Sequence, residues 1–284
     1  MKISDIIKQQ ERTLSLEVFP PKTTERYESV QKSVMEIAAL KPDFMSVTYG
    51  AGGGTSMFTA KLAKEVKDVY GVTAMAHLSC ISSSKEMVKE QLNSIKALGL
   101  SNILALRGDI PEGFSTEELD YHYANELVKE IKQFDDFCVG GACYPEGHPE
   151  SGSLTEDIEH LKYKIEAGCE FLTTQMFFDN SLFYKYLEMI GNAGITIPII
   201  AGIMPITNEN QVERTLKLSG AFLPKQFIHL LESYSGNAGD FYKAGLDYAV
   251  KQVRDLYEHG VKNVHIYTMN KPDVAKQIVK ALTL

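Results

Sequence analysis

Cysteine is scarce in this sequence, and the few that occur are not arranged to bind a metal. The four cysteines, Cys80, Cys138, Cys143 and Cys169, include no C-x-x-C pair and no histidine neighbour at metal-ligand spacing. Disulfide frameworks and structural zinc sites depend on such patterns. We therefore interpret the cysteines as reduced thiols of a cytosolic protein, and we expect no zinc site.

An excess of positive charge and a long apolar run are also missing. Lys and Arg total 29 against 37 for Asp and Glu, so the net charge of −8 gives no general attraction to nucleic acid or an anionic membrane. Any anionic ligand must therefore be bound by a local cluster. The most apolar run, 195–206, is short and is broken by Pro198 and Pro205, and the N-terminal segment MKISDIIKQQER predicts a short amphipathic helix without an apolar signal-peptide core. We expect no membrane span and a cytoplasmic protein.

What the sequence does contain is a regular alternation of β-type runs with segments of helical periodicity. Continuous apolar runs are typical of parallel strands covered on both faces, and their alternation with helices over 284 residues favours a (β/α)8 barrel. We predict an α/β protein with a single (β/α)8 TIM barrel domain over residues 1–284 and one extra helix near 224–233. A doubly wound sheet is the alternative. The eight runs are TLSLEVF, FMSVTYG, VTAMAHLSC, NILALRGD, FCVGGACY, FLTTQMFF, IPIIAGIMPI and VKNVHIYTM.

Polar and ionisable residues recur near the ends of these runs. In a (β/α)8 barrel the active site lies where strands end and the following loops begin, so such residues should meet at one rim. Each has a structural explanation on its own: Glu17 as a buried ion-pair partner, His77 as a satisfied core histidine, and Gln175 as a hydrogen-bonded core amide. Their common position predicts a functional site instead. The set comprises Glu17, Thr48, Tyr49, Gly50, His77, Arg107, Gly108, Asp109, the stretch 144–148 and Gln175.

Six motifs in order, LSLEVFPPKT, VTYGAGGGT, LALRGD, GACYPEGHPES, TTQMFFD and AGIMPIT, resemble the methylenetetrahydrofolate reductase family. The resemblance extends from about Ser15 to the YTMN stretch at Tyr267. It implies a (β/α)8 barrel that binds FAD and reduces 5,10-methylenetetrahydrofolate to 5-methyltetrahydrofolate. It also implies the short bacterial type without the C-terminal regulatory region of eukaryotic relatives, and a homo-oligomer.

The resemblance implies that Glu17 and Asp109 are catalytic and also contact the folate. Glu17 would be the general acid that protonates N10 and opens the five-membered ring to an N5 iminium cation. Because Leu16, Val18 and Phe19 flank it, we expect Glu17 to be desolvated, with a raised pKa that keeps its proton available near neutral pH. Asp109 would stabilise the developing cation and disfavour excess negative charge on the reduced flavin. The alternative of an Arg-Gly-Asp adhesion tripeptide does not fit a cytosolic protein.

A larger set matches the positions that line the flavin. Of these, Arg107 and Lys164 suit the charge of the pyrophosphate, and Asp157 suits a ribose hydroxyl. The run Gly50 to Gly54 matches neither G-x-G-x-x-G nor G-x-x-x-x-G-K-[ST], so it is either a flexible loop that permits close backbone approach or a simple turn. The flavin set is Thr48, His77, Arg107, Gly108, Asp109, Tyr123, Ala124, Ala142, Tyr144, His148, Asp157 and Lys164.

Three further positions are expected at the folate. Gln175 matches a glutamine that pairs with the pterin edge, where a carboxamide can donate and accept at once. Gln211 matches a second glutamine, but Thr215 falls where some bacterial members have a stacking phenylalanine. Lys271 follows TMN where an arginine is common, so it keeps a cation for the glutamate tail without the bidentate fork.

The hydride donor is not identified by any nicotinamide-specific motif, so NADH and NADPH both remain candidates. With one barrel mouth and no separate dinucleotide domain, donor and folate should use the same flavin face in turn, by a ping-pong route. Two other functions stay open: a flavin-free aldolase or lyase, and a subunit of a redox assembly that receives electrons from another protein.

Overall fold

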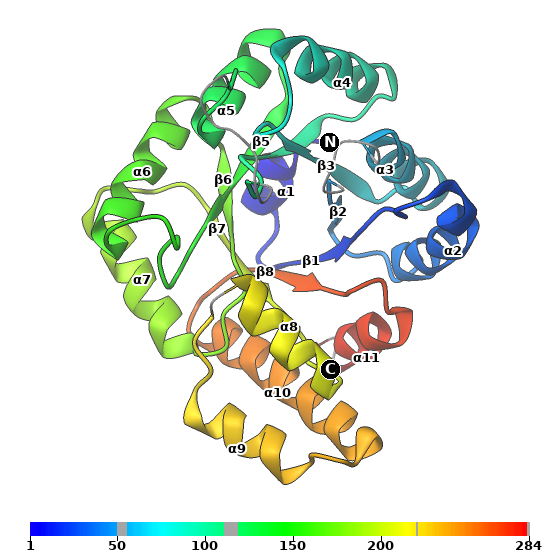
Figure 1. The fold of residues 1–284 in the computed structure, drawn as a ribbon, viewed down its shortest axis with the longest axis vertical. Helices are drawn as coiled ribbons and strands as arrows, with labels where there is room; N and C mark the ends of the chain where they lie inside the picture. Colours follow the sequence, from blue (N-terminus) through cyan, green and yellow to red (C-terminus); the bar gives the residue numbers. More distant parts are fainter. Residues whose placement is uncertain (50–55, 111–118, 220, 283–284) are drawn as a thin grey trace.

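Eight parallel strands close into a barrel, in the order in which they occur along the chain. The computed structural model describes residues 1–49, 56–110, 119–219 and 221–282, and only the backbone of residues 56, 214 and 216–219. β1 pairs with β8 as well as with β2, which closes the sheet and confirms the predicted barrel over a doubly wound sheet (Figure 1). The strands are β1 (Thr13–Val18), β2 (Phe44–Val47), β3 (Thr73–Ser79), β4 (Asn102–Leu106), β5 (Cys138–Cys143), β6 (Phe171–Thr174), β7 (Ile199–Ile203) and β8 (Asn263–Tyr267).

Helices surround the barrel between successive strands. Several begin at a residue whose side chain caps the helix; Ser84 accepts from the Met87 amide and Ser153 from the Glu156 amide. The helix predicted near 224–233 is present as α9. The outer helices are α2 (Tyr27–Ala38), α3 (Ser56–Tyr70), α4 (Lys85–Ala97), α5 (Ala124–Phe134), α6 (Leu154–Glu166), α7 (Asn180–Asn192), α10 (Ala238–Glu258) and α11 (Pro272–Leu282). The remaining helices are α1 (Ile3–Gln9), the 3-10 turn η1 (Thr24–Arg26), α8 (Glu209–Ser219) and α9 (Lys225–Ser233).

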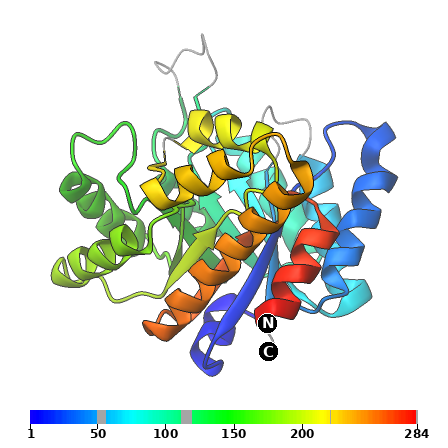
Figure 2. The same ribbon diagram turned by 90° about the horizontal axis from the view of Figure 1, so that it is seen from below.

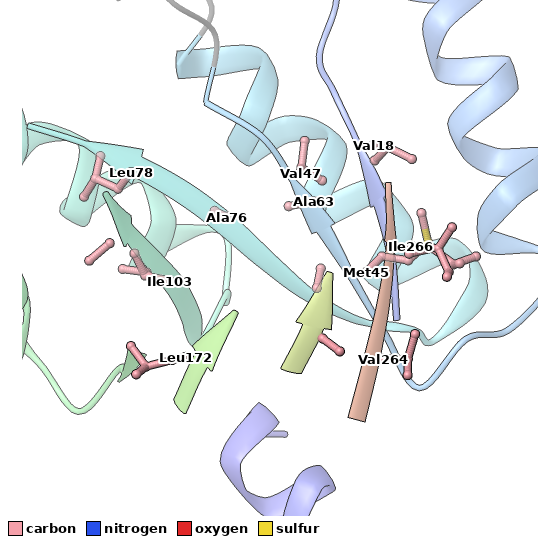
Figure 3. Packing of buried hydrophobic residues seen from close by; sticks show 14 of the residues in the cluster. Val18, Met45, Val47, Ala63, Ala76, Leu78, Ile103, Leu172, Val264 and Ile266 are labelled. Atoms are coloured by element: carbon pink, nitrogen blue, oxygen red, sulfur yellow. The ribbon is translucent and has the colours of Figure 1, made fainter. Parts of the chain in front are cut away.

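The main hydrophobic core lies between the outside of the barrel and these helices. Strand side chains alternate between the two faces, so Leu16 and Val18 of β1 pack outward with Met45, Val47 and other residues (Figure 3). The residue between them, Glu17, therefore faces the barrel interior. This alternation decides which neighbours set the chemistry of each strand residue.

A second core closes the amino end of the barrel. Ile3, Ile6 and Ile7 of α1 pack with residues from the bottom of the strands, among them Phe44 and Phe171. The Asn102 side chain accepts from the Ile3 amide at 2.8 Å and so fixes this helix. Figure 2 shows α1, in dark blue, at the opposite end of the barrel from the yellow α8. The interior is thus sealed at one end, and the strand ends at the other are left for a site.

No helix within the described ranges combines the length and the apolarity needed to cross a bilayer.

Candidate active site

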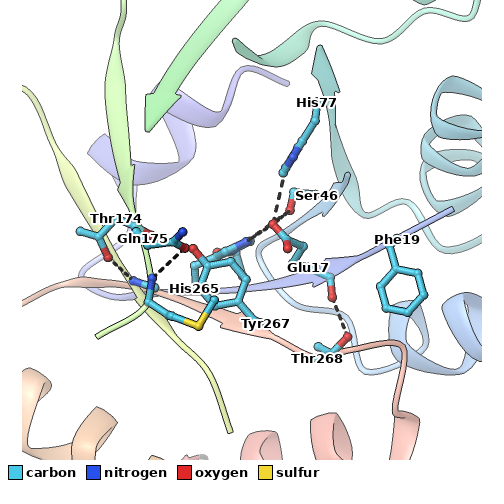
Figure 4. A network of polar contacts seen from close by, with 12 residues as sticks. Glu17, Phe19, Ser46, His77, Thr174, Gln175, His265, Tyr267 and Thr268 are labelled. Carbon is cyan, nitrogen blue, oxygen red and sulfur yellow. Dashed lines mark hydrogen bonds and ion pairs between the residues drawn. The ribbon is translucent and has the colours of Figure 1, made fainter. Parts of the chain in front are cut away.

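Glu17 lies inside the barrel mouth among polar side chains from three other strands (Figure 4). Its Oε2 atom is 3.4 Å from His265 Nε2 and 3.6 Å from His77 Nε2, and it accepts from Ser46 Oγ at 3.3 Å. His77 is on β3, two strands from β1, so the contact crosses the interior. The Glu17 side chain is 18% exposed, against 6% for His77 and 2% for His265. The carboxylate is therefore the most accessible member of a buried cluster.

Strand pairing and hydrogen bonds to the backbone fix the position of Glu17. Glu17 is in register with Ser46 on β2 and with Tyr267 on β8. Its carbonyl accepts from the Thr268 hydroxyl at 2.5 Å. Just beyond, the Asn270 amide group donates to the Phe19 carbonyl at 2.8 Å and accepts from the Phe19 amide at 2.9 Å. The loop after β8 thus clamps the chain as it leaves β1 before Pro20 and Pro21.

The expectation of a raised pKa for Glu17 is wrong for the protein without ligands. Burial alone raises this pKa, but the hydrogen bond to His265, the electrostatic influence of the His77 and His265 rings and the Ser46 hydroxyl outweigh it, so the pKa lies below its ordinary value. The apolar neighbours Leu16 and Val18 point to the opposite face of β1 and do not surround the carboxylate. Sequence neighbours were therefore the wrong environment to consider.

His77 is the second perturbed group of the cluster. Burial, opposed by Glu17 and supported by His265, lowers the pKa of His77 to about 4, so the ring is neutral near pH 7. Its Nε2 atom is buried and has no hydrogen-bond partner among the described residues. His77 therefore presents an unused polar atom at the barrel mouth.

Arg107 and Gly108 directly follow β4 and shape a second part of the rim. The Arg107 guanidinium binds the Glu150 carboxylate through both terminal nitrogens, at 2.5 and 2.6 Å, and its Nε donates to the Gly108 carbonyl at 3.2 Å. Gly108 has a φ of +89°, and a Cβ there would overlap Ser79 Oγ. Asp109 is exposed, and its charge acts on both Arg107 and Tyr144. The LRGD motif therefore needs its glycine for conformation and for space.

The loop after β5 and helix α6 bring most of the remaining predicted flavin residues together. Tyr144 and His148 pack edge to face, with ring centroids 4.7 Å apart. Lys164 Nζ donates to the Ala142 carbonyl at 2.8 Å, and burial lowers its pKa. Asp157 is buried; burial raises its pKa, and its Oδ2 atom has no partner among the described residues. A buried acceptor and a half-buried cation thus lie close to the end of β5.

The other predicted flavin residues begin nearby elements. Thr48 follows β2 and is half-buried, and its carbonyl accepts from Thr59 Oγ1 at 2.9 Å. Tyr123 is 64% exposed at the start of α5, and the adjacent Ala124 is buried. Among the described residues, no hydrogen bond or ion pair joins these side chains to Arg107 or Lys164. The run Gly50 to Gly54 lies outside the described residues.

The predicted folate residues form one tight group and one separate position. Gln211 Oε1 accepts from the amide and the hydroxyl of Thr207 at 2.9 and 3.0 Å, and Lys271 Nζ lies 2.9 Å from the same hydroxyl and 3.3 Å from Gln211 Oε1. Burial lowers the pKa of Lys271. Gln175 follows Thr174, whose carbonyl accepts from the Tyr267 hydroxyl at 2.6 Å (Figure 4). Thr215, at the departure from the family pattern, is buried.

Sequence reasoning did not identify Ser46, His265, Tyr267 or Glu150 as members of the site. A signal for His265 and Tyr267 was present, because they stand two residues apart in the run NVHIY and must share a face of the strand. Ser15 and Glu17 have the same spacing in β1, and Ser15 Oγ lies 2.7 Å from His265 Nδ1. Paired polar residues at a spacing of two in an apolar strand thus mark the interior side of this barrel.

Comparison with known proteins places the chain within a family. The family model described as methylenetetrahydrofolate reductase matches residues 2–283. The chain is 34% identical over 269 residues to 5,10-methylenetetrahydrofolate reductase of Escherichia coli, covering 95% of this chain and 90% of that protein. It is 35% identical over 293 residues to methylenetetrahydrofolate reductase 1 of Schizosaccharomyces pombe, with 100% of this chain covered but only 49% of the yeast protein.

A solved structure shares the fold at low sequence identity. It is an uncharacterized protein from Clostridium thermocellum that binds two copies of 5-methyl-5,6,7,8-tetrahydrofolic acid, with a TM-score of 0.69, 15% identity and 99% of both chains covered. That likeness concerns the barrel alone. The family model, which spans nearly every residue, and the E. coli relative, which is matched over most of its length, carry the assignment: the chain belongs to the methylenetetrahydrofolate reductase family.

Proposed function

We propose that the protein reduces 5,10-methylenetetrahydrofolate to 5-methyltetrahydrofolate, with FAD as cofactor and NADH or NADPH as the hydride source. The observation that carries this proposal is the position of Glu17. Its ionisable carboxyl group lies at the carboxyl end of the barrel, opposite the end that α1 closes, and within 3.6 Å of two imidazoles. Family membership supplies the reaction, and the carboxyl group supplies the acid that the reaction needs.

The rim fits FAD in charge and in unsatisfied polar atoms. Arg107 and Lys164 offer cations for a pyrophosphate, and the buried Oδ2 of Asp157, which lacks a partner in the described part of the chain, can accept from a ribose hydroxyl. When bound, FAD supplies a ring that takes a hydride from a reduced nicotinamide and passes it to the folate.

Glu17 must gain a proton before it can act, because its pKa is lowered in the protein without ligands. Ligands that fill the mouth exclude water from the exposed side of the carboxyl group, which strengthens the burial contribution and raises the pKa. Glu17 then donates its proton to N10, the bond from the methylene carbon to N10 breaks, and the N5 iminium carbon becomes the hydride acceptor. Glu17 regains a proton from solvent after the product leaves.

The remaining residues bind and orient. Gln175 offers both an amide donor and an acceptor at the end of β6, suited to a pterin edge. Lys271 is a half-buried cation with neutral partners, the Thr207 hydroxyl and the Gln211 amide, and suits the carboxylate of a glutamate tail. Asp109 adds an exposed negative charge at the rim, which favours a developing cation. These assignments follow the family pattern residue by residue.

A flavin spectrum followed by anaerobic titration tests this function. The purified protein should be yellow, should bleach on addition of NADH or NADPH, and should regain its colour on addition of methylenetetrahydrofolate. A colourless protein that does not take up FAD would favour a flavin-free aldolase or lyase. A yellow protein that neither nicotinamide bleaches would favour a subunit that receives electrons from another protein.

A further inference from the structure

The Glu150 carboxylate binds the two terminal guanidinium nitrogens of Arg107, which are the atoms that would bind a phosphate. Both terminal nitrogens of the guanidinium are taken by the two carboxylate oxygens, at 2.5 and 2.6 Å. This parallel, bidentate geometry is the one in which arginine also binds phosphate oxygens. The carboxylate therefore stands where an anionic ligand would make its strongest contacts.

The two partners differ in how firmly they are held. The Arg107 side chain is 17% exposed and is tied by its Nε to the Gly108 carbonyl, whereas the Glu150 side chain is 55% exposed. The Glu150 backbone amide donates to His148 Nδ1 at 3.1 Å, so the loop fixes the backbone of Glu150. Within the described part of the chain, the Glu150 carboxylate accepts its hydrogen bonds from Arg107. The carboxylate can rotate into solvent while Arg107 stays in place.

We propose that Glu150 competes with the pyrophosphate of FAD for Arg107, and that it thereby sets how tightly the dinucleotide is held and how fast it is released. This inference rests on the proposed flavin-dependent function and adds to it a residue that determines cofactor affinity. An anionic ligand must displace the carboxylate or share Arg107 with it.

The charge of Glu150 determines whether its removal should strengthen or weaken FAD binding. The hydrogen bond to Arg107 lowers the pKa of Glu150, so the group is ionised at neutral pH. An ionised carboxylate beside a pyrophosphate repels it, and removing that charge should favour binding. Because Glu150 is more than half exposed, solvent screening keeps the effect small, about threefold to tenfold in the dissociation constant.

The test compares Glu150→Gln with the parent protein, using flavin fluorescence to measure the dissociation constant of FAD and the rate of FAD release from the loaded protein. Glu150→Gln should bind FAD about threefold to tenfold more tightly and release it more slowly. Riboflavin, which lacks the pyrophosphate, should bind both proteins equally. Glu159→Gln, which removes the same charge from an exposed pair with Lys162, serves as the matched control and should change neither ligand.

A double-mutant cycle ties the effect to Arg107. In an Arg107→Gln background, Glu150→Gln should no longer tighten FAD binding, because the contested group is gone. Unchanged or weaker FAD binding by Glu150→Gln, or an equal gain for riboflavin, would overturn the inference while leaving the flavin function intact. If the parent itself does not bind FAD, the flavin function fails and this inference fails with it. Thermal melts of each variant confirm that the compared proteins are folded.

Discussion

At the scale of single residues, the chemistry of Glu17 is set by side chains that are remote in sequence. His265 is 248 residues away along the chain, yet its ring nitrogen lies 3.4 Å from the carboxylate. Ser46 and His77 come from two other strands. Local sequence therefore indicated the presence of an unusual carboxyl group but not its protonation state.

The substitution Glu17→Gln should affect the two half-reactions differently, namely reduction of the flavin by the nicotinamide and its reoxidation by the folate. Glu17→Gln keeps the shape of the side chain but removes the proton that ring opening requires. We expect the variant to retain FAD and to be bleached by reduced nicotinamide within roughly tenfold of the parental rate. Colour recovery with methylenetetrahydrofolate should slow by about 10²- to 10⁴-fold. Anaerobic stopped-flow absorbance measures both steps.

The same experiment can contradict the assignment. Parental recovery with folate would show that Glu17 is not the acid. Loss of the flavin or of the fold would show that the carboxyl group is structural. Glu159→Gln, on the exposed face of α6, is the control for loss of one carboxylate.

The neutral state of His77 should appear in the pH dependence of stability. Its pKa falls from 6.5 to about 4 on folding, so between these values the unfolded chain binds more protons than the folded one. Stability from this group is therefore complete above pH 6.5 and is lost as the pH falls toward 4, by roughly 3 kcal/mol in total. Glu17 acts in a lower window: its folded pKa is depressed below 4.5, so its contribution is lost only as the pH falls below that value.

Urea unfolding at a series of pH values measures this contribution. The parent should lose stability between pH 6.5 and pH 4 more steeply than His77→Asn. Equal slopes for the two proteins would mean that the imidazole takes up its proton as readily when folded as when unfolded.

At the scale of elements, the sequence was informative about the strands because they are apolar runs, several of which are followed directly by polar residues. Runs such as FMSVTYG and NILALRGD overlap β2 and β4 and differ from them mainly at the carboxyl ends. There the chain leaves the sheet at the functional residues. Thr48, Arg107 and Gln175 accordingly lie just beyond the strands that predicted them.

Contacts between elements were less visible in the sequence. The local sequence around Gln211 or Lys271 does not show that α8 contacts the loop before α11. The two side chains lie 3.3 Å apart but are 60 residues apart along the chain. Likewise the Arg107 pair with Glu150 joins residues 43 positions apart. Such pairs depend on how the barrel closes, so periodicity and local motifs cannot identify them.

Helix α1 should matter for stability and not for catalysis, because it seals the end of the barrel away from the site. Ile3 is fully buried there. Truncation of a buried isoleucine to alanine leaves a cavity, so Ile3→Ala should lower the free energy of unfolding by about 2 to 5 kcal/mol. Urea unfolding measures the loss, and turnover measured well below the melting temperature should stay close to that of the parent.

Ile228→Ala provides the comparison. This isoleucine of α9 is 39% exposed, so its truncation should cost far less. Equal losses of unfolding free energy for the two variants would contradict this expectation. So would a large drop in turnover for Ile3→Ala under conditions in which the variant is fully folded.

At the scale of the whole molecule, α1 covers the amino end of the barrel, and the residues that the structure describes leave the carboxyl end open. The predicted flavin and folate residues follow the carboxyl ends of the strands, while α1 covers the amino end. Under the proposed function, the nicotinamide and the folate would reach the flavin from the same side. Initial rates should therefore give parallel double-reciprocal lines when one substrate is varied at several fixed levels of the other. Intersecting lines would indicate that both substrates bind together.

The closure of the barrel by β1 and β8 has a consequence for synthesis of the protein. Glu17 is synthesised 248 residues before His265, which lies beside it in the folded barrel. Until β8 emerges, β1 has one edge without its partner, and the Glu17 carboxylate lacks its contact with His265. The sheet therefore closes, and the surroundings of Glu17 are complete, only after β8 has been made. The incomplete chain, with an unpaired strand edge, is the form most prone to aggregation.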